Sequence, residues 1–198
     1  YDRKERRFLG FSNLRRGLPC AAGETVCPFT LTTFSQKPQL IGKPTQVETY
    51  GEPLYLGAAT LQRRAFMSYM TNEYDDGVVA DRRPYTAVEE KRFEYTYNRV
   101  GAFKRTRMTR KFDNIERIGS GFSWRWRAGF GSMTAELREG DLDRAGDEFY
   151  TSNVYVPNTI AYITNRLAAT SRFAGISAAG TLIGQQLRCY DGAADSGA

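Results

Sequence analysis

Three cysteines, Cys20, Cys27 and Cys189, offer the most varied chemistry in this chain of 198 residues. The first two lie in a segment rich in proline and glycine, and the third lies near the other end. On residue type alone four interpretations stay open: a disulfide between Cys20 and Cys27 with Gly23 in the turn, a thiol activated by neighbouring arginines, attachment points for a prosthetic group, and unmodified thiols. A zinc site is not expected, because this spacing with one distant thiol does not supply a tetrahedral ligand set.

Histidine is absent from the sequence. The chain therefore lacks the side chain that titrates nearest neutral pH and is the commonest metal ligand. Acidic clusters occur at Asp75–Asp76, at Glu89–Glu90 and from Glu139 to Asp147, but none has the ligand spacing of a calcium loop. We interpret these clusters as solvated or ion-paired surfaces. The residue types thus favour a binding protein over an enzyme, with no metal site.

A basic and aromatic segment from Arg99 to Arg127 is the strongest candidate binding surface. It holds nine basic residues against Asp113 and Glu116, interleaved with phenylalanine and tryptophan. Nucleic-acid binding would place the arginines on phosphates and the tryptophans on bases, whereas protein docking would use the same residue types as interface hot spots. Because only two of the nine are lysine, we favour protein docking. The residues expected to dock a partner are Arg99, Arg105, Arg107, Arg110, Trp124, Arg125, Trp126 and Arg127.

The overall composition is typical of a folded, basic protein. Of the 28 basic residues 22 are arginine, the formal net charge is +6, and 41% of the residues are hydrophobic, enough for the core of one domain. Arginine keeps its charge, forms forked hydrogen bonds to carboxylate or phosphate, and stacks on aromatic rings. The composition therefore indicates a large acidic partner, which could be nucleic acid, an anionic membrane surface or an acidic protein. No apolar run approaches the roughly 18 residues that a membrane span needs.

The apolar pattern predicts a mainly α fold with several helices and a long irregular N-terminal arm. Prolines recur through residues 1–53, so we expect that segment to be an extended arm, since proline interrupts helices and central strands alike. Residues 54–188 are expected to form a helical core, and residues 189–198 a C-terminal tail.

Within that core the helical spacing is clearest in two places. A stripe containing Leu61, Ala65 and Tyr69 predicts a first helix. Thr86 and Glu89 have the spacing of a capping box, which predicts the start of a second helix that ends near residue 112. We also expect helices over residues 133–150 and 158–187, and a short strand or wide turn in the glycine-rich stretch 119–131.

Two of these segments share a short internal sequence repeat. Residues 97–102 with Arg105 and residues 164–169 with Arg172 share the spacing of an Asn, an Arg, an Ala and a second Arg. Two pseudosymmetric helical halves would produce this repeat, and so would chance in an arginine-rich chain.

Two stretches and the general composition resemble the gamma subunits of red-algal phycoerythrin, which are linker proteins of the phycobilisome that carry bilins. The stretches are Pro44–Gly51 (PTQVETYG) and Leu54–Met70 (LYLGAATLQRRAFMSYM), together with the cysteine-bearing, proline-rich segment and abundant Arg and Tyr. The resemblance implies a basic linker that occupies the cavity of acidic phycoerythrin hexamers, built from alpha and beta subunits, and that contacts other phycobilisome linkers. It also implies a location in the plastid, at the stromal face of the thylakoid membrane, with no nucleic-acid partner.

The same resemblance implies roles for individual residues. Cys20, Cys27 and Cys189 would hold phycourobilin, phycoerythrobilin or both through thioethers, and Cys20 and Cys27 could share one pigment. The residues expected to contact the pigments are Arg15, Arg16 and Arg188, near bilin propionates, and Asp191, near pyrrole nitrogens. The expected function is light harvesting and energy transfer without chemical turnover. The alternative from the basic segment is an RNA-binding or ribosome-associated protein.

Overall fold

The protein is an antiparallel β structure. The computed structural model describes residues 10–20, 22–23, 27–51, 60–71, 74–75, 78–79, 86–98, 101–118, 123–126, 129–157, 163 and 165–189. Within these ranges there is no α-helix, and the one helical element is a 3-10 turn, η1 (Pro38–Leu40). The predicted mainly α fold is therefore wrong. The predicted irregular arm is wrong as well, because three strands lie between Asn13 and Gly51.

Two sheets contain the described strands. The strands are β1 (Asn13–Gly17), β2 (Phe29–Phe34), β3 (Pro44–Gly51), β4 (Thr60–Thr71), β5 (Tyr74–Asp75), β6 (Val78–Val79), β7 (Ala87–Tyr97), β8 (Phe103–Phe112), β9 (Ile115–Ile118), β10 (Ser123–Trp126), β11 (Met133–Glu139), β12 (Phe149–Tyr155), β13 (Leu167–Ala174) and β14 (Leu182–Leu187). The large sheet has the order β1-β2-β3-β4-β7-β8-β11-β12-β13-β14, with β9 beside β8 and β10 beside β9. Strands β5 and β6 pair with each other.

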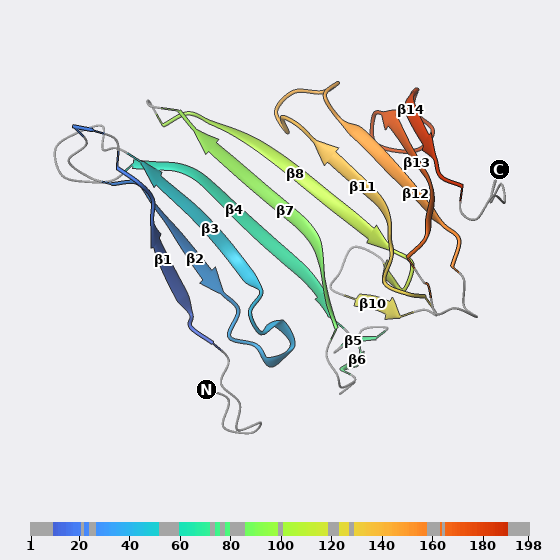
Figure 1. Cartoon of the computed structure of the whole chain (residues 1–198), viewed down its shortest axis with the longest axis horizontal. Coiled ribbons are helices and arrows are strands. Elements are labelled where there is room, and N and C mark those ends of the chain that lie inside the picture. The colour runs from blue at the N-terminus through green and yellow to red at the C-terminus, as the bar shows by residue number, and fades with distance from the viewer. Residues whose placement is uncertain are drawn as a thin grey trace. The chain divides into compact units, whose positions relative to one another are not determined.

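The chain divides into two compact units. Unit 1 comprises residues 1–71 and 84–107, and unit 2 comprises residues 72–83 and 108–198. Unit 1 contains β1 to β4 and β7, and unit 2 contains β9 to β14 with β5 and β6; the boundary falls within β8. Figure 1 shows that within each unit the main strands follow one another as antiparallel neighbours, blue to green in unit 1 and yellow to red in unit 2.

Strand β4 shows why the helical prediction failed. Ala65 and Met67 are buried, whereas Phe66 and Ser68, which alternate with them, are exposed, which is the two-residue period of a strand. The helical interpretation placed Phe66 on the same apolar stripe as Ala65. In the structure these two side chains lie on opposite faces of the sheet.

The predicted second helix is instead a hairpin of β7 and β8. Its turn is closed by hydrogen bonds from the Asn98 amide to the Ala102 carbonyl (2.8 Å) and from the Gly101 amide to the Asn98 carbonyl (3.1 Å). Gly101 has a φ of 84°, a conformation that glycine adopts without strain. The capping box does not form, because Thr86 precedes β7 and the Glu89 carboxylate accepts hydrogen bonds from Arg92.

The two remaining helical predictions are also strand pairs. Residues 133–155 form the hairpin of β11 and β12, and residues 167–187 form the pair β13 and β14. The repeated Asn-Arg-Ala segments therefore do not mark two helical halves. One expectation is confirmed: the glycine-rich stretch 119–131 contains a short strand, β10, paired with β9.

Few apolar side chains are buried among the residues that the structure describes. The buried apolar side chains among the described residues are Ala65, Met67, Met70, Ile115, Ala135 and Ala168, and no described large side chain is fully enclosed. Much of the aromatic and aliphatic surface of the sheet is therefore half-buried or exposed. A surface of that kind is suited to contact with a partner.

Candidate docking surface

Seven aromatic rings among the described residues lie on one face of the sheet in unit 1, which we call the aromatic face. Strand register explains how they gather, because directly opposed residues project to the same side. Phe29 is opposite Tyr50, and Phe66 is opposite Phe93. The rings of this face are Phe29, Tyr50, Phe66, Phe93, Tyr95, Tyr97 and Phe103.

Most of these rings touch one another. Phe29 stacks on Tyr50 with ring centroids 4.7 Å apart. Phe66 meets Tyr95 edge to face at 6.0 Å, and Tyr95 meets Phe103 at 5.6 Å. Such geometries are favourable for aromatic pairs and hold the side chains in fixed orientations. Phe66 and Phe103 are 37% and 51% exposed, so this ordered array also reaches solvent.

Arginines stack on the same rings. The guanidinium carbon of Arg15 lies 4.0 Å from the centroid of Phe29, and those of Arg64 and Arg107 lie 5.9 Å from Phe66 and Phe93. A guanidinium over a ring is attracted by the π electrons and loses freedom before any partner arrives. The cationic groups of the aromatic face are thus pre-positioned.

A buried carboxylate anchors the middle of the aromatic face. Glu48 accepts hydrogen bonds from Arg64 Nε (2.6 Å) and from the Tyr50 hydroxyl (3.1 Å). Burial and the neighbouring carboxylate of Glu48 raise the pKa of Tyr50. Arg64 is therefore held in place by an ion pair on one side and by the ring of Phe66 on the other.

The aromatic face carries an excess of positive charge. Among the described residues, the register and the alternation of side chains place five basic residues on it with the acid Glu48, and a second acid, Glu90, lies 3.8 Å from Lys91. The basic residues are Arg15, Arg64, Lys91, Arg105 and Arg107. An excess of this kind attracts an acidic surface, and the rings add apolar contact area.

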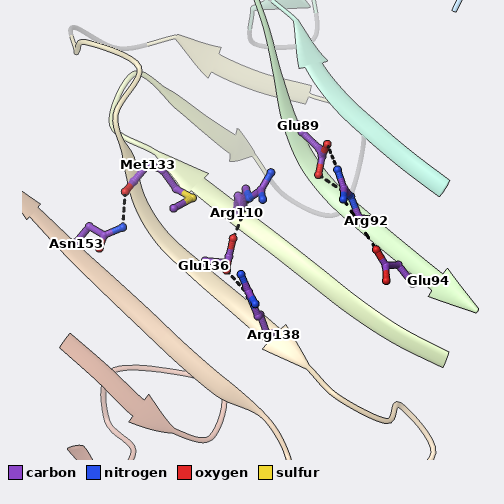
Figure 2. A network of polar contacts seen from close by, with 8 residues as sticks. All are labelled: Glu89, Arg92, Glu94, Arg110, Met133, Glu136, Arg138 and Asn153. Atoms are coloured by element: carbon purple, nitrogen blue, oxygen red, sulfur yellow. Dashed lines mark hydrogen bonds and ion pairs between the residues drawn. The ribbon is translucent and has the colours of Figure 1, made fainter. Parts of the chain in front are cut away.

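The opposite face of unit 1, which we call the polar face, holds the buried Ala65 and Met67 together with charged side chains that pair with one another. Arg92 donates two hydrogen bonds to Glu89 (2.9 and 3.1 Å) and lies 3.9 Å from Glu94, which Figure 2 shows along β7. Arg63 also pairs with Glu94. Tyr69, whose hydroxyl donates to the Pro44 carbonyl (2.8 Å), has its pKa raised to about 12 by burial and by Glu89. Since these charges satisfy one another, the polar face is less suited to docking.

The predicted basic segment does not form one surface. Strand β8 alternates, so Arg105 and Arg107 project to the aromatic face, and Arg110 projects to the other side, where it pairs with Glu136. Arg125 in β10 is exposed, and Trp124 and Trp126 belong to the same strand. Of the other residues expected to dock a partner, Arg99 and Arg127 lie outside the described residues.

Two of the three cysteines form a disulfide. Cys20 and Cys27, with Cα atoms 4.7 Å apart, join the ends of β1 and β2, and Gly23 in the intervening turn has a φ of 90°. The disulfide interpretation, with Gly23 in the turn, is confirmed. A sulfur in a disulfide cannot at the same time form a thioether, so in this state the free thiol is that of Cys189, which is exposed two residues after β14.

The residues expected to contact a pigment are not gathered into one site. Arg15 lies over Phe29, and Arg16, the next residue of β1, projects to the opposite side. The Arg188 amide donates to the Ala168 carbonyl (2.8 Å), which ties the end of β14 to β13. Asp191 lies outside the described residues.

Sequence reasoning missed most of the aromatic face because it assumed a helical period. A two-residue period would have grouped Arg64 with Phe66 and would have grouped Phe93, Tyr95 and Tyr97. The cross-strand partners, such as Phe29 and Tyr50, could not be paired without the strand register.

The fold and this surface define an all-antiparallel β protein with a cationic, aromatic face. No protein-family model, curated protein or solved structure matches the chain. In the described part of the chain, no helix is long and apolar enough to cross a membrane. Nor do the described residues contain a group of three or more cysteines and acids placed to hold a metal ion.

Proposed function

We propose that the chain is a docking protein that binds an acidic protein assembly through its aromatic face. The observation that carries this proposal is the array of seven rings with stacked arginines on one side of unit 1. Arg, Tyr and Phe are common in protein interfaces because they combine large contact area with hydrogen bonding. Fixed side chains lose little further entropy on binding, which favours affinity.

The resemblance to phycoerythrin gamma subunits supplies the partner. We propose acidic phycoerythrin hexamers, with the protein acting as a phycobilisome linker in the plastid. The N-terminal segment would not enter the ring as an extended arm, because residues 13–51 contain three strands of the sheet. The contact would instead be made by the sheet face around Phe66 and Arg107.

Pigment attachment is the second part of the proposal. With Cys20 and Cys27 in a disulfide, Cys189 is the thiol that would carry phycourobilin or phycoerythrobilin. Its exposed position leaves room for a large prosthetic group. Attachment at Cys20 or Cys27 would require prior reduction of the disulfide, since thioether formation needs a free thiolate.

Binding to isolated phycoerythrin hexamers tests the docking part. We expect cosedimentation of the wild-type chain, and we expect Phe66→Ser or Arg15→Gln to weaken binding about tenfold, the effect of losing one interface hot spot. The matched control is Arg144→Gln, which removes the same charge from an exposed turn in unit 2. Equal binding by Phe66→Ser, Arg15→Gln and wild type would show that the aromatic face is not the docking surface.

The same preparations separate this proposal from RNA binding. An RNA-binding protein would bind single-stranded RNA at low salt and lose affinity steeply as salt rises, because each phosphate contact releases a counterion. Tight RNA binding without hexamer binding would replace the proposal with that alternative. The division of the basic segment between two faces of β8 argues against it.

Pigment attachment has its own test. The denatured protein, separated on a gel and stained with zinc, should fluoresce, and Cys189→Ser should abolish the fluorescence. A dark wild-type band from the native source would remove the pigment claim and leave the docking claim standing.

A further inference from the structure

Unit 2 contains two arginines that lie over a single ring, that of Phe149. The guanidinium carbons of Arg138 and Arg172 lie 5.9 and 3.7 Å from the centroid of that ring. Arg138 is directly opposite Phe149, and Arg172 is opposite Thr151, two residues further along β12. All three side chains therefore project to the same face of the sheet.

Arg138 already has a carboxylate partner. Glu136 accepts hydrogen bonds from Arg138 Nε (2.5 Å) and from Arg110 Nε (3.0 Å), as Figure 2 shows. Glu136 is nearly buried; burial alone would raise its pKa, but the two arginines outweigh that effect and lower it. Arg138 thus combines a ring against its guanidinium with a carboxylate at its Nε, the arrangement that a guanidinium group favours.

Arg172 lies over the ring of Phe149 but has no carboxylate partner among the described residues. Its side chain is exposed, and its guanidinium forms no hydrogen bond or ion pair with any residue that the structure describes. On β14 it faces Gly184, around whose missing side chain there is open space out to 4 Å. The local charge is uneven as well, because among the described residues of this cluster three arginines, Arg110, Arg138 and Arg172, are opposed by one acid, Glu136.

We propose that Arg172, together with Arg138 and the ring of Phe149, binds a carboxylate group from an acidic segment of a partner protein. The incoming carboxylate would pair with Arg172 as Glu136 pairs with Arg138, and it would approach Arg172 over Gly184. A carboxylate is preferred because the neighbouring pair of Glu136 with Arg138 shows that this face accommodates one. The proposal does not rest on the aromatic face, because each residue of this site belongs to unit 2.

An NMR titration of the arginine Nε–H signals tests this site. The probe is a tetraglutamate peptide with blocked ends, and the Arg172 signal is identified by its disappearance in Arg172→Lys. We expect that signal to shift with saturation as peptide is added. In the variants the dissociation constant is followed through the Arg138 Nε–H signal, and Arg172→Gln should raise it about tenfold, the effect of losing one charged hydrogen bond. Arg172→Lys should also weaken binding, because lysine keeps the charge but loses the fork and the stacking.

Arg144→Gln is the control, since it removes an equal charge from the exposed turn between β11 and β12. It should leave the dissociation constant unchanged. The proposal is overturned if the Arg172 shift grows linearly without saturation, or if Arg172→Gln binds the peptide as wild type does. Inorganic phosphate serves as the second probe, and saturation at lower phosphate than peptide concentration would overturn the assignment to a carboxylate. The result of the hexamer-binding experiment is independent of this titration, because that experiment concerns unit 1.

Discussion

Each unit contains a nearly buried carboxylate held by arginine. Glu48 in unit 1 accepts from Arg64, and Glu136 in unit 2 accepts from Arg110 and Arg138. Burying an ion is unfavourable unless its partners are well placed, and removing one partner leaves the other charge uncompensated. These acids therefore fix the positions of the arginines around them, which in turn reach the rings of Phe66 and Phe149.

The first prediction concerns the pH dependence of stability through Glu136. The pKa of Glu136 is lowered from the ordinary 4.5 in the folded protein. Its stabilising contribution is therefore complete above about pH 4.5 and is lost as the pH falls through the lower folded value. Glu136→Gln should lower the free energy of unfolding by about 2 kcal/mol near pH 7, the loss of charged hydrogen bonds, and by less in acid.

The measurement is the free energy of unfolding from urea denaturation, taken near pH 7 and at pH values below about 4.5. Asp147→Asn is the control, because Asp147 is an exposed acid of the same unit with no hydrogen bond to a described residue. Its stability profile should parallel that of wild type. A Glu136→Gln profile that ran parallel to wild type throughout would contradict the prediction.

At the scale of elements, the helical prediction failed where strands are only partly buried. In β7 and β8, charged residues occupy both faces, so the apolar residues do not alternate cleanly and their spacings of three and four resemble a helix. Strands of this kind are specified by cross-strand pairs, such as Phe66 with Phe93, which a linear pattern does not show. The short strand expected within residues 119–131, in contrast, is present as β10.

The sequence predicted the residue types of the candidate site but not where those residues lie in the fold. The sequence indicated arginines beside aromatic rings, and Arg105 and Arg107 do lie on the aromatic face. Four of the other members, Arg15, Phe29, Glu48 and Tyr50, come from a segment that proline content had suggested was an arm. Proline is compatible with strand ends, and Pro44 begins β3.

The second prediction concerns the disulfide of the β1–β2 hairpin. A cross-link between Cys20 and Cys27 restricts the unfolded chain, which for a loop this short contributes about 2–3 kcal/mol in the chain-entropy account. Cys20→Ser with Cys27→Ser should lower stability by that amount in denaturation experiments. Cys189→Ser should have no effect. Equal stability of the double variant and wild type would show that the cross-link does not constrain this hairpin.

The third prediction concerns β14, which pairs only with β13 among the described strands and is exposed along its length. Its sequence LIGQQL has no charge or proline, the usual protections of an edge strand. Ile183→Lys should therefore reduce concentration-dependent self-association, measured by analytical ultracentrifugation. Ile176→Lys is the control, because Ile176 is equally apolar and exposed but precedes the strand. An equal reduction by both variants would mean that hydrophobicity, and not the edge, drives association.

At the scale of the whole molecule, the net charge of +6 and the rings should contribute to docking differently. Salt at about 1 M shortens the range of electrostatic interactions to about 3 Å, while apolar contacts persist. The fourth prediction is that the binding defect of Arg15→Gln toward phycoerythrin hexamers shrinks at high salt and that the defect of Phe66→Ser remains. Calorimetric titration at two salt concentrations measures both. A Phe66→Ser defect that vanished with salt would show that the ring makes no apolar contact.

The most direct test of the docking claim is hydroxyl-radical footprinting of the protein alone and bound to phycoerythrin hexamers. Phe66 and Phe103 are exposed on the aromatic face of unit 1, and Phe130 and Ile176 are exposed in unit 2. The account predicts that oxidation of Phe66 and Phe103 slows in the complex while oxidation of Phe130 and Ile176 is unchanged. Unslowed oxidation of Phe66 and Phe103 in a complex of confirmed stoichiometry would contradict it.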